Sequence, residues 1–535
     1  MLKLSSRTTK SLLALHGWLA VLLGLLLYVV VLTGTLAVFS KELGQWSNPL
    51  AAAAPSHYPE GIDGLLRGLS ERIDPGYREE LFVFPSADGR LRALFHSHTT
   101  NDEGATEERG VLALIDPSRL VIVEEREGEV GDLFEALDNS AFTDFLVDLH
   151  VRLVLPGQWG LLLTGVLGFA MLAAAVSGFL LHRHLITELF TLRRRGGLLT
   201  ARDKHALAGA WNLPFAFLLA FTGAFFSFGG AIGLPAIAYV AFGGDVDSVS
   251  EQLLSTPLPE DTRAVPLVNL DALLADARQR TGAEPDSLQI LHWGRADASV
   301  RMSMHTVEGR LLADHIAYAG ATGEYLGLKP VLGNAPSVGG DLAGLMTPLH
   351  FGNFAGLYSK ILWFAFGFAS AYVTLTGLTL WTARRRNEPG WAWLERATVW
   401  VGFGLPLSLL VNAFVVFGCG MLGSPAVPWL LECFAATAVL SGIYVWRARD
   451  IDGAKRALLG CLAVLLMLAP LARWLDNGVS WVGALNTGQL DLMGVDIALV
   501  IAALCCLRAS LAGSRPPEPE PESRAPVSMS VVQRS

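Results

Sequence analysis

The segment LHGWLAVLLGLLLYVVVLTGTLAVFSKEL, residues 15–43, decides the fold class. Its apolar run from Leu12 to Phe39 exceeds the about 20 residues that cross a bilayer and the roughly 7–15-residue core of a signal peptide. We therefore expect a retained first membrane helix. Across 535 residues, 52% are hydrophobic and 17% are charged, and the mean hydropathy is +0.43, so the chain is a polytopic membrane protein.

Seven further segments meet the same criterion. Together with the first, the expected spans are about 12–39, 158–182, 206–232, 353–382, 397–418, 427–446, 457–474 and 490–508. Basic residues gather at the N-terminus and in segments 183–204, 384–386 and 447–456. Positive charge favours the cytoplasmic side of short loops. We therefore expect both termini in the cytoplasm and the two long loops on the opposite, periplasmic or extracellular, face.

Each long loop contains a helical pattern followed by short strand-like runs. Residues 61–73 precede ELFVFP (80–85) and three further runs, and residues 268–280 precede SLQILHW (287–293) and its followers. The repetition predicts a duplication over roughly 1–190 and 200–386. The expected fold is an all-α membrane bundle of about eight helices, with a four-helix core from a duplicated helix pair and two small α+β domains.

Histidines recur at matched positions in this duplicated frame. His16 precedes Thr33-Gly34 by 17 residues, and His205 precedes Thr222-Gly223 by the same number. His150 precedes Ser177-Gly178 by 27 residues, and His350 precedes Thr376-Gly377 by 26.

The duplication predicts an approximate two-fold axis along the membrane normal, so equivalent residues face each other. We expect His16 to meet His205 near the cytoplasmic face, and His150 to meet His350 near the periplasmic face. Haem iron accepts two axial imidazoles, and a four-helix bundle presents them from facing helices. Because the chain has no C-x-x-C-H motif for covalent attachment, we predict two haem b groups with these four histidines as iron ligands.

Other polar residues leave their roles open. His182 lies at the cytoplasmic end of the second span, and its counterpart by duplication is Trp381, so it is an alternative to His16 or His205 as the cytoplasmic-side ligand. His96 and His98 place two imidazoles on one face of a strand, a weak metal signal without a third ligand. A further set forms either another site or interfacial contacts: Arg473, Asp476, Asp491 and Asp496.

Four segments resemble, in chain order, the PepSY-associated transmembrane helix family. They are residues 15–43, SGFLLHRHLITELFTLR (177–193), HALAGAWNLPFAFLLAFTG (205–223) and residues 349–386. A stretch from about Val265 to Leu326 looks like the family's PepSY domain, and the likeness covers roughly residues 1–390. That family includes iron-regulated bacterial inner-membrane proteins, some of them dihaem reductases that release iron from ferric siderophores. The resemblance implies two b-type haems and a reductive role in iron uptake.

The expected organisation combines the spans with this resemblance. It comprises transmembrane helix 1 at 1–39, a periplasmic domain at 40–157, helices 2 and 3 with a basic cytoplasmic loop at 158–232, a periplasmic PepSY domain at 233–352, helix 4 at 353–386, a four-helix membrane extension at 397–508 and a disordered cytoplasmic tail at 513–535.

The leading hypothesis is an inner-membrane dihaem oxidoreductase that passes electrons across the membrane to a periplasmic ferric chelate. Because no dinucleotide-binding fingerprint is present, the donor is a membrane quinol or another protein. The expected partners are the lipid bilayer, that donor and a ferric siderophore or other chelate, and no nucleic acid. Two alternatives stay open: a PepSY-type periplasmic binding or regulatory protein without redox activity, and an iron-chelate permease.

Overall fold

The computed structural model describes residues 4–48, 58–86, 89–100, 106–135, 140–182, 190, 197–244, 249, 253, 255–305, 310–333, 335–385, 387–388 and 390–512. The basic loop 183–204 falls only partly within them, and the tail 513–535 lies outside them.

Eight helices among the described residues are long and apolar enough to cross a membrane, so the predicted spans are confirmed. They are α1 (Ser6–Ala37), α6 (Gln158–Leu181), α8 (Gly197–Phe228) continued by η4 (Gly229–Gly233) and α9 (Leu234–Ala241), α13 (Gly356–Arg384), α14 (Ala392–Val399) continued by η5 (Trp400–Gly404) and α15 (Leu405–Leu422), α16 (Val427–Arg447), α17 (Ile451–Asn477) and α19 (Leu490–Ala512).

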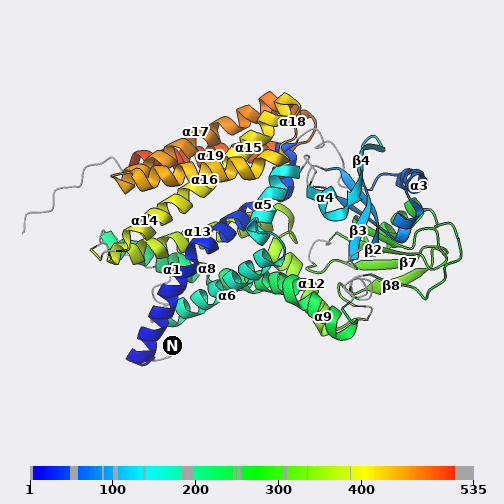
Figure 1. Ribbon diagram of the computed structural model, residues 1–535, viewed down its shortest axis with the longest axis horizontal. Coiled ribbons are helices and arrows are strands. Elements are labelled where there is room, and N and C mark those ends of the chain that lie inside the picture. The colour runs from blue at the N-terminus through cyan, green and yellow to red at the C-terminus, as the bar shows by residue number, and fades with distance from the viewer. Residues whose placement is uncertain are drawn as a thin grey trace, which may run out of the picture.

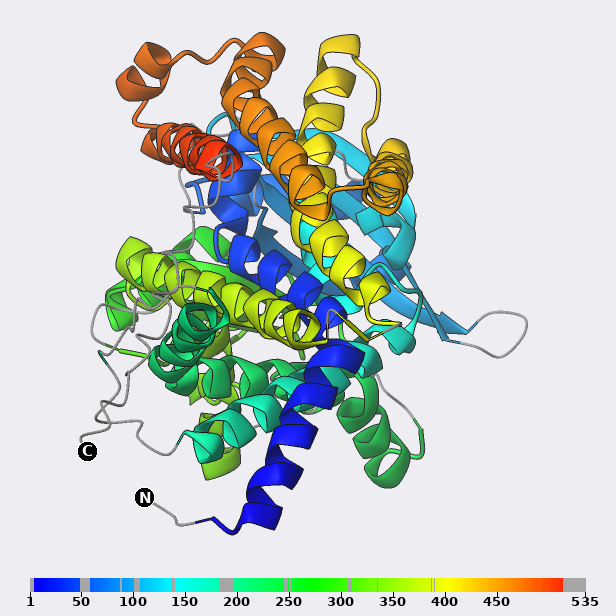
Figure 2. The same cartoon turned by 90° about the vertical axis from the view of Figure 1, so that its left-hand side faces the viewer.

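The membrane helices form two groups, which Figure 2 shows from the side that carries the N-terminus. In the first group, which we call the core bundle, α1 and α8 each pack against both α6 and α13. The second group, from α14 to α19, lies beside it. It is joined to α1 by the Tyr28 hydroxyl, which donates to the carbonyl oxygen of Gly402 on η5 at 2.9 Å. The core bundle therefore consists of the two helix pairs that the duplication predicts.

A buried ion pair ties the second group to α2 (Ser40–Ser47). Arg473 and Asp496 are 1% and 0% exposed, and a guanidinium nitrogen lies 2.9 Å from the carboxylate. The indole nitrogens of Trp46, on α2, and Trp481, on α18 (Trp481–Asn486), donate to the same carboxylate at 2.7 and 2.8 Å. Of the four polar residues singled out in the extension, these two thus form a structural contact between helices.

Eight strands in the described part of the chain form one antiparallel sheet, in the order β4-β3-β2-β1-β5-β6-β7-β8. The first loop supplies β1 (Glu80–Pro85), β2 (Leu91–Thr100), β3 (Thr106–Asp116) and β4 (Val121–Glu129), and the second supplies β5 (Pro285–Leu291), β6 (Ser299–Met304), β7 (His315–Ala319) and β8 (Tyr325–Lys329). The sequence predicts two separate domains, but β1 pairs with β5, with Leu81 opposite Ile290. This pairing removes two strand edges whose backbone groups would otherwise lack partners.

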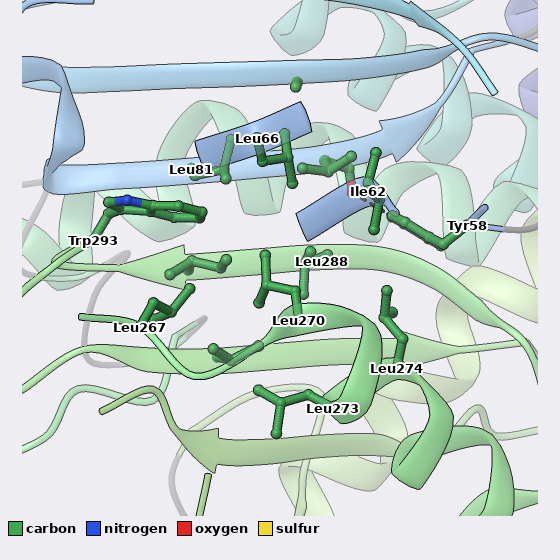
Figure 3. Packing of buried hydrophobic residues seen from close by; sticks show 14 of the residues in the cluster. Tyr58, Ile62, Leu66, Leu81, Leu267, Leu270, Leu273, Leu274, Leu288 and Trp293 are labelled. Atoms are coloured by element: carbon green, nitrogen blue, oxygen red, sulfur yellow. Dashed lines mark hydrogen bonds between the residues drawn. The ribbon is translucent and has the colours of Figure 1, made fainter. Parts of the chain in front are cut away.

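The sheet lies beyond one end of the core bundle, which we call the sheet side (Figure 1). One face of the sheet is covered by α3 (Ile62–Arg72) and α11 (Leu270–Thr281). Their leucines recur at helical spacing and pack on Leu81 and Leu288 in the largest hydrophobic core (Figure 3). The short helix η2 (Pro75–Glu79) leads from α3 into β1.

The opposite face of the sheet turns toward the core bundle. Arg92, on β2, contacts the Ser140 hydroxyl at 2.5 Å and the Asp144 carboxylate at 3.7 Å, at the start of α5 (Ala141–Arg152). The helix α4 (Val130–Glu135) packs on the same face, over Leu94 and Leu112. The helices α5 and α12 (Val338–Phe351) then connect the sheet to the spans α6 and α13.

Candidate functional site

Two pairs of histidines lie at opposite ends of the core bundle. On the side away from the sheet, the rings of His16 on α1 and His205 on α8 have centres 6.3 Å apart. On the sheet side, the rings of His150 on α5 and His350 on α12 have centres 6.1 Å apart, with an angle of 28° between their planes. The structure thus brings together the same partners that the duplication predicts.

The imidazoles away from the sheet are held by neighbouring helices through Nδ1. His16 Nδ1 lies 3.0 Å from the carbonyl oxygen of Ala174 and 3.1 Å from the hydroxyl of Ser177, both on α6. His205 Nδ1 lies 3.1 Å from the hydroxyl of Thr376 on α13. That hydroxyl donates its hydrogen to the carbonyl oxygen of Tyr372 at 2.8 Å, so it accepts a hydrogen bond from His205 Nδ1–H.

The imidazoles on the sheet side are held in the same manner. His150 Nδ1 donates to the carbonyl oxygen of Val30 on α1 at 2.8 Å. His350 Nδ1 lies 2.9 Å from the hydroxyl of Thr222 on α8, which donates its own hydrogen to the carbonyl oxygen of Leu218. A proton on Nδ1 leaves the Nε2 lone pair available, which is the arrangement that orients a metal-binding histidine.

Each serine or threonine of the four motifs is followed by a glycine that faces a histidine ring. A Cβ atom on Gly34 would lie 2.5 Å from Cε1 of His150. The same contact recurs at the other three glycines, where the corresponding distances are 3.3 Å for Gly178 and His16, 3.3 Å for Gly223 and His350, and 3.2 Å for Gly377 and His205. Side chains at these positions would therefore press on the imidazoles.

These contacts explain the spacing in the sequence. In the sequence, the motif Thr33-Gly34 is linked to His16 by a fixed spacing on the same span. In the structure, this part of α1 instead contacts His150, which lies on another helix. Each of α1 and α8 carries a histidine of one pair and a Thr-Gly motif whose glycine lies against a histidine of the other pair. At 1.5 Å per residue, a 17-residue offset separates the two levels by about 25 Å along the helix. The two histidine pairs are therefore separated by most of the roughly 30 Å thickness of a bilayer's hydrocarbon core.

The paired rings suit a shared metal ion. None of the four Nε2 atoms makes a hydrogen bond to any residue in the described segments. With metal–nitrogen bonds of about 2.0–2.1 Å, two imidazoles on one ion have ring centres roughly 6 Å apart, and both pairs match that separation. Burial lowers the pKa of His350 to about 3, so its ring is neutral, as metal binding requires.

The sequence profile of the PepSY-associated TM region family matches residues 13–384. The chain belongs to the PepSY-associated TM region family. An uncharacterized protein of Pseudomonas aeruginosa is 27% identical over 400 residues, which is 71% of this chain and 97% of that protein. All four histidines and all four Ser/Thr-Gly motifs lie within the matched region. Because the match ends at residue 384, α14 to α19 lie beyond it.

One further histidine of the PepSY-associated TM region lies outside both pairs. His182 directly follows α6, and its backbone N–H donates to the carbonyl oxygen of Phe179 at 3.2 Å. Its Nδ1 is buried with no hydrogen-bond partner in the segments that the structure describes. The ring contact on that side of the bundle joins His16 to His205. The geometry therefore favours His16 and His205 over His182 as the pair on the side away from the sheet.

Proposed function

We propose that this chain is a dihaem electron-transfer protein of the bacterial inner membrane. It passes electrons across the membrane and reduces a periplasmic ferric chelate such as a siderophore. The observation that carries the proposal is the recurrence of one arrangement at two levels of the core bundle. In each, two imidazoles face each other, each with Nδ1 held by a neighbouring helix and Nε2 left without a hydrogen bond.

In this proposal His16 and His205 hold one haem b, and His150 and His350 hold the other. When bound, haem supplies one-electron exchange between Fe(III) and Fe(II). The hydroxyls of Ser177, Thr376 and Thr222 and the carbonyl of Val30 fix the tautomer and orientation of the rings. The glycine beside each ring leaves room for the imidazole, because a Cβ atom there would lie 2.5 to 3.3 Å from its Cε1 atom.

The charge pattern of the loops supports the direction of transfer. Arg202 and Lys204 lie at the start of α8, and Arg384 and Arg385 lie at the end of α13, both away from the sheet. Positive charge in short loops favours the cytoplasmic face. Electrons would therefore enter from a membrane quinol or a protein donor near His16 and His205, and leave from the sheet side in the periplasm.

Haem content and redox spectra of the purified full chain test the proposal. The expected result is two haems per chain and a reduced-minus-oxidised difference spectrum typical of haem b. The variants His205→Ala and His350→Ala should each lose one haem. The variant His305→Ala changes an exposed histidine that directly follows β6, and it should keep both haems. A protein without reducible haem would overturn the proposal, and capture of a periplasmic partner by that haem-free protein would favour the binding or regulatory alternative.

Ferric-chelate reduction needs a separate measurement. Protein reduced with dithionite, freed of excess reductant and mixed with a ferric siderophore should return to its oxidised spectrum as ferrous iron is trapped by a ferrous-specific chelator. The variant His350→Ala should slow this reaction at least tenfold, because the sheet-side pair is the one next to the substrate. If haem-loaded protein left the ferric chelate unchanged, the ferric chelate would be excluded as the substrate, while the proposed electron transfer through haem would still stand.

A further inference from the structure

A second cluster of ligating side chains lies on the sheet, outside both histidine pairs. His96 and His98 are on β2, Glu108 is on β3 and Glu80 is on β1. In the strand register His96 is opposite Glu80, and His98 is opposite Glu108. Directly opposed residues of an antiparallel pair point to the same face, as do residues two apart on one strand. All four side chains therefore share one face of the sheet.

The distances within this cluster are those of a ligand set. One ligating atom each from His96, His98 and Glu108 lie within 4.8 Å of one another. His98 Nε2 is 3.4 Å from a Glu108 carboxylate oxygen, and His96 Nε2 is 3.6 Å from a Glu80 carboxylate oxygen. The two imidazole rings have centres 5.6 Å apart. No third ligand is next to His96 and His98 in the sequence, but Glu108 on the neighbouring strand β3 supplies one.

His96 gives independent evidence for a ligand. Its side chain is 7% exposed, and neither Nδ1 nor Nε2 has a hydrogen-bond partner in the described parts of the chain. Leaving a buried polar group without a hydrogen bond is unfavourable, so such a group indicates a bound ion or another partner. Phe82 stacks on the ring, with centres 6.1 Å apart. Opposite His96, Gly110 leaves it room, since a Cβ there would lie 2.8 Å from the Cβ of His96.

We propose that His96, His98 and Glu108 bind a divalent first-row transition-metal ion of the zinc or ferrous type, with Glu80 beside them. Two imidazoles and one carboxylate suit such ions, whereas calcium and magnesium prefer oxygen ligands throughout. Three protein ligands leave at least one coordination position for water or for a ligand from solution. The site is additional to the proposed haem sites and does not depend on them.

The protonation states of these residues agree with the geometry. Burial lowers the pKa of His96 to about 4, so the ring stays neutral at neutral pH. The hydrogen bond from His98 lowers the pKa of Glu108, which keeps its carboxylate ionised. Neutral imidazole and ionised carboxylate are the forms that bind metals.

The cluster faces the core bundle. Arg92, on the same face of β2 as His96, contacts Ser140 and Asp144 at the start of α5. The helix α5 ends two residues after His150, a member of the sheet-side pair. An ion in the cluster would therefore be held on the side of the protein where the proposed reduction of ferric chelates takes place.

Zinc binding to the purified full chain tests this proposal. Protein equilibrated with zinc chloride and passed through a desalting column is analysed for bound zinc by mass spectrometry. The variants His98→Gln and Glu108→Gln should each retain one zinc ion per chain fewer than the unaltered protein. The four bundle histidines are the same in all these proteins, so any zinc that they bind cancels from the comparison.

The matched control is His305→Gln. His305 also lies near a carboxylate, with Nδ1 3.4 Å from Asp286, but both side chains are about half exposed and no third ligand among the described residues joins them. This variant should keep the full zinc content, and magnesium or calcium chloride should not displace the zinc. Zinc should also raise the melting temperature of the unaltered protein, and this rise should be absent in His98→Gln. Equal zinc content and equal melting shifts in all four proteins would overturn the proposal.

Discussion

The hydroxyl oxygen of Thr222 lies 2.9 Å from Nδ1 of His350, and its own hydrogen is donated to the carbonyl of Leu218. The hydroxyl can therefore only accept from the imidazole, which fixes the proton on Nδ1. A similar contact occurs at the other end of the bundle, where the Thr376 hydroxyl accepts from His205 Nδ1 at 3.1 Å. The same arrangement thus orients one histidine of each pair.

The variant Thr222→Val should weaken haem binding at the sheet-side pair and leave the other pair unchanged. Valine keeps the shape of the threonine but removes the acceptor for His350 Nδ1–H, and loss of such a partner typically costs 10–100-fold in metal affinity. Haem titration of the purified protein should show one normal and one weakened site. In the control Thr379→Val the lost hydroxyl bonds, among the described residues, only to the Leu375 carbonyl of its own helix, and both sites should be normal.

The variant Gly34→Ala should displace His150. Its Cβ atom would lie 2.5 Å from the Cε1 atom of that ring, so the ring or the helix must move. We expect loss of the sheet-side haem, seen as half the haem content and a simpler redox titration. The control Gly418→Ala is also in a membrane helix, where a Cβ would meet nothing within 4 Å, and should keep both haems. Full haem content in Gly34→Ala would contradict the role of this glycine.

The membrane helices and the pairing of histidines can be predicted from the sequence for a simple physical reason. A helix rises 1.5 Å per residue, so equal offsets within a duplicated frame place His16 and His205 at the same depth. The partners of Nδ1 cannot be predicted in this way. The contact of His150 with Val30 depends on how α5 packs against α1, and that packing joins residues 120 positions apart.

In the sheet and its candidate metal site, too, the contacts between distant residues cannot be predicted from the sequence. The strands are visible in the sequence as short runs with alternating apolar residues, and their positions are confirmed by β1 to β8. The pairing of β1 with β5 joins segments about 200 residues apart, and no local pattern specifies it. Likewise, Glu108 completes the cluster with His96 and His98 only through the register of β2 against β3.

The variant Asp496→Asn should destabilise the contact between α2, α17 and α19. It removes one charge of a fully buried ion pair and leaves Arg473 uncompensated, which typically costs about 3–5 kcal/mol. The expected result is a clear fall in the melting temperature of the detergent-solubilised protein. The control Asp450→Asn breaks an exposed pair with Arg456, worth about 0–1 kcal/mol, and should change the melting temperature little. Equal melting curves for both variants would argue against a stabilising role for the buried pair.

The stability of the sheet should fall as the pH is lowered from about 6.5 toward 4, and His315 on β7 should account for part of that fall. Burial, with a smaller contribution from the positive charge of Arg301, lowers the pKa of His315 to about 4. The unfolded chain, with a histidine pKa near 6.5, binds a proton in this window that the folded protein does not bind. Protonation therefore favours unfolding, by at most about 3 kcal/mol for this one group once the pH reaches 4.

Replacement of His315 by glutamine removes that proton site, so the difference in melting temperature between pH 7 and pH 4.5 should be smaller in His315→Gln than in the unaltered chain. His96 has a pKa lowered in the same direction and is present in both proteins, so the comparison isolates His315. If His315→Gln and the unaltered chain lost the same number of degrees on acidification, His315 would not contribute to the acid sensitivity of the sheet.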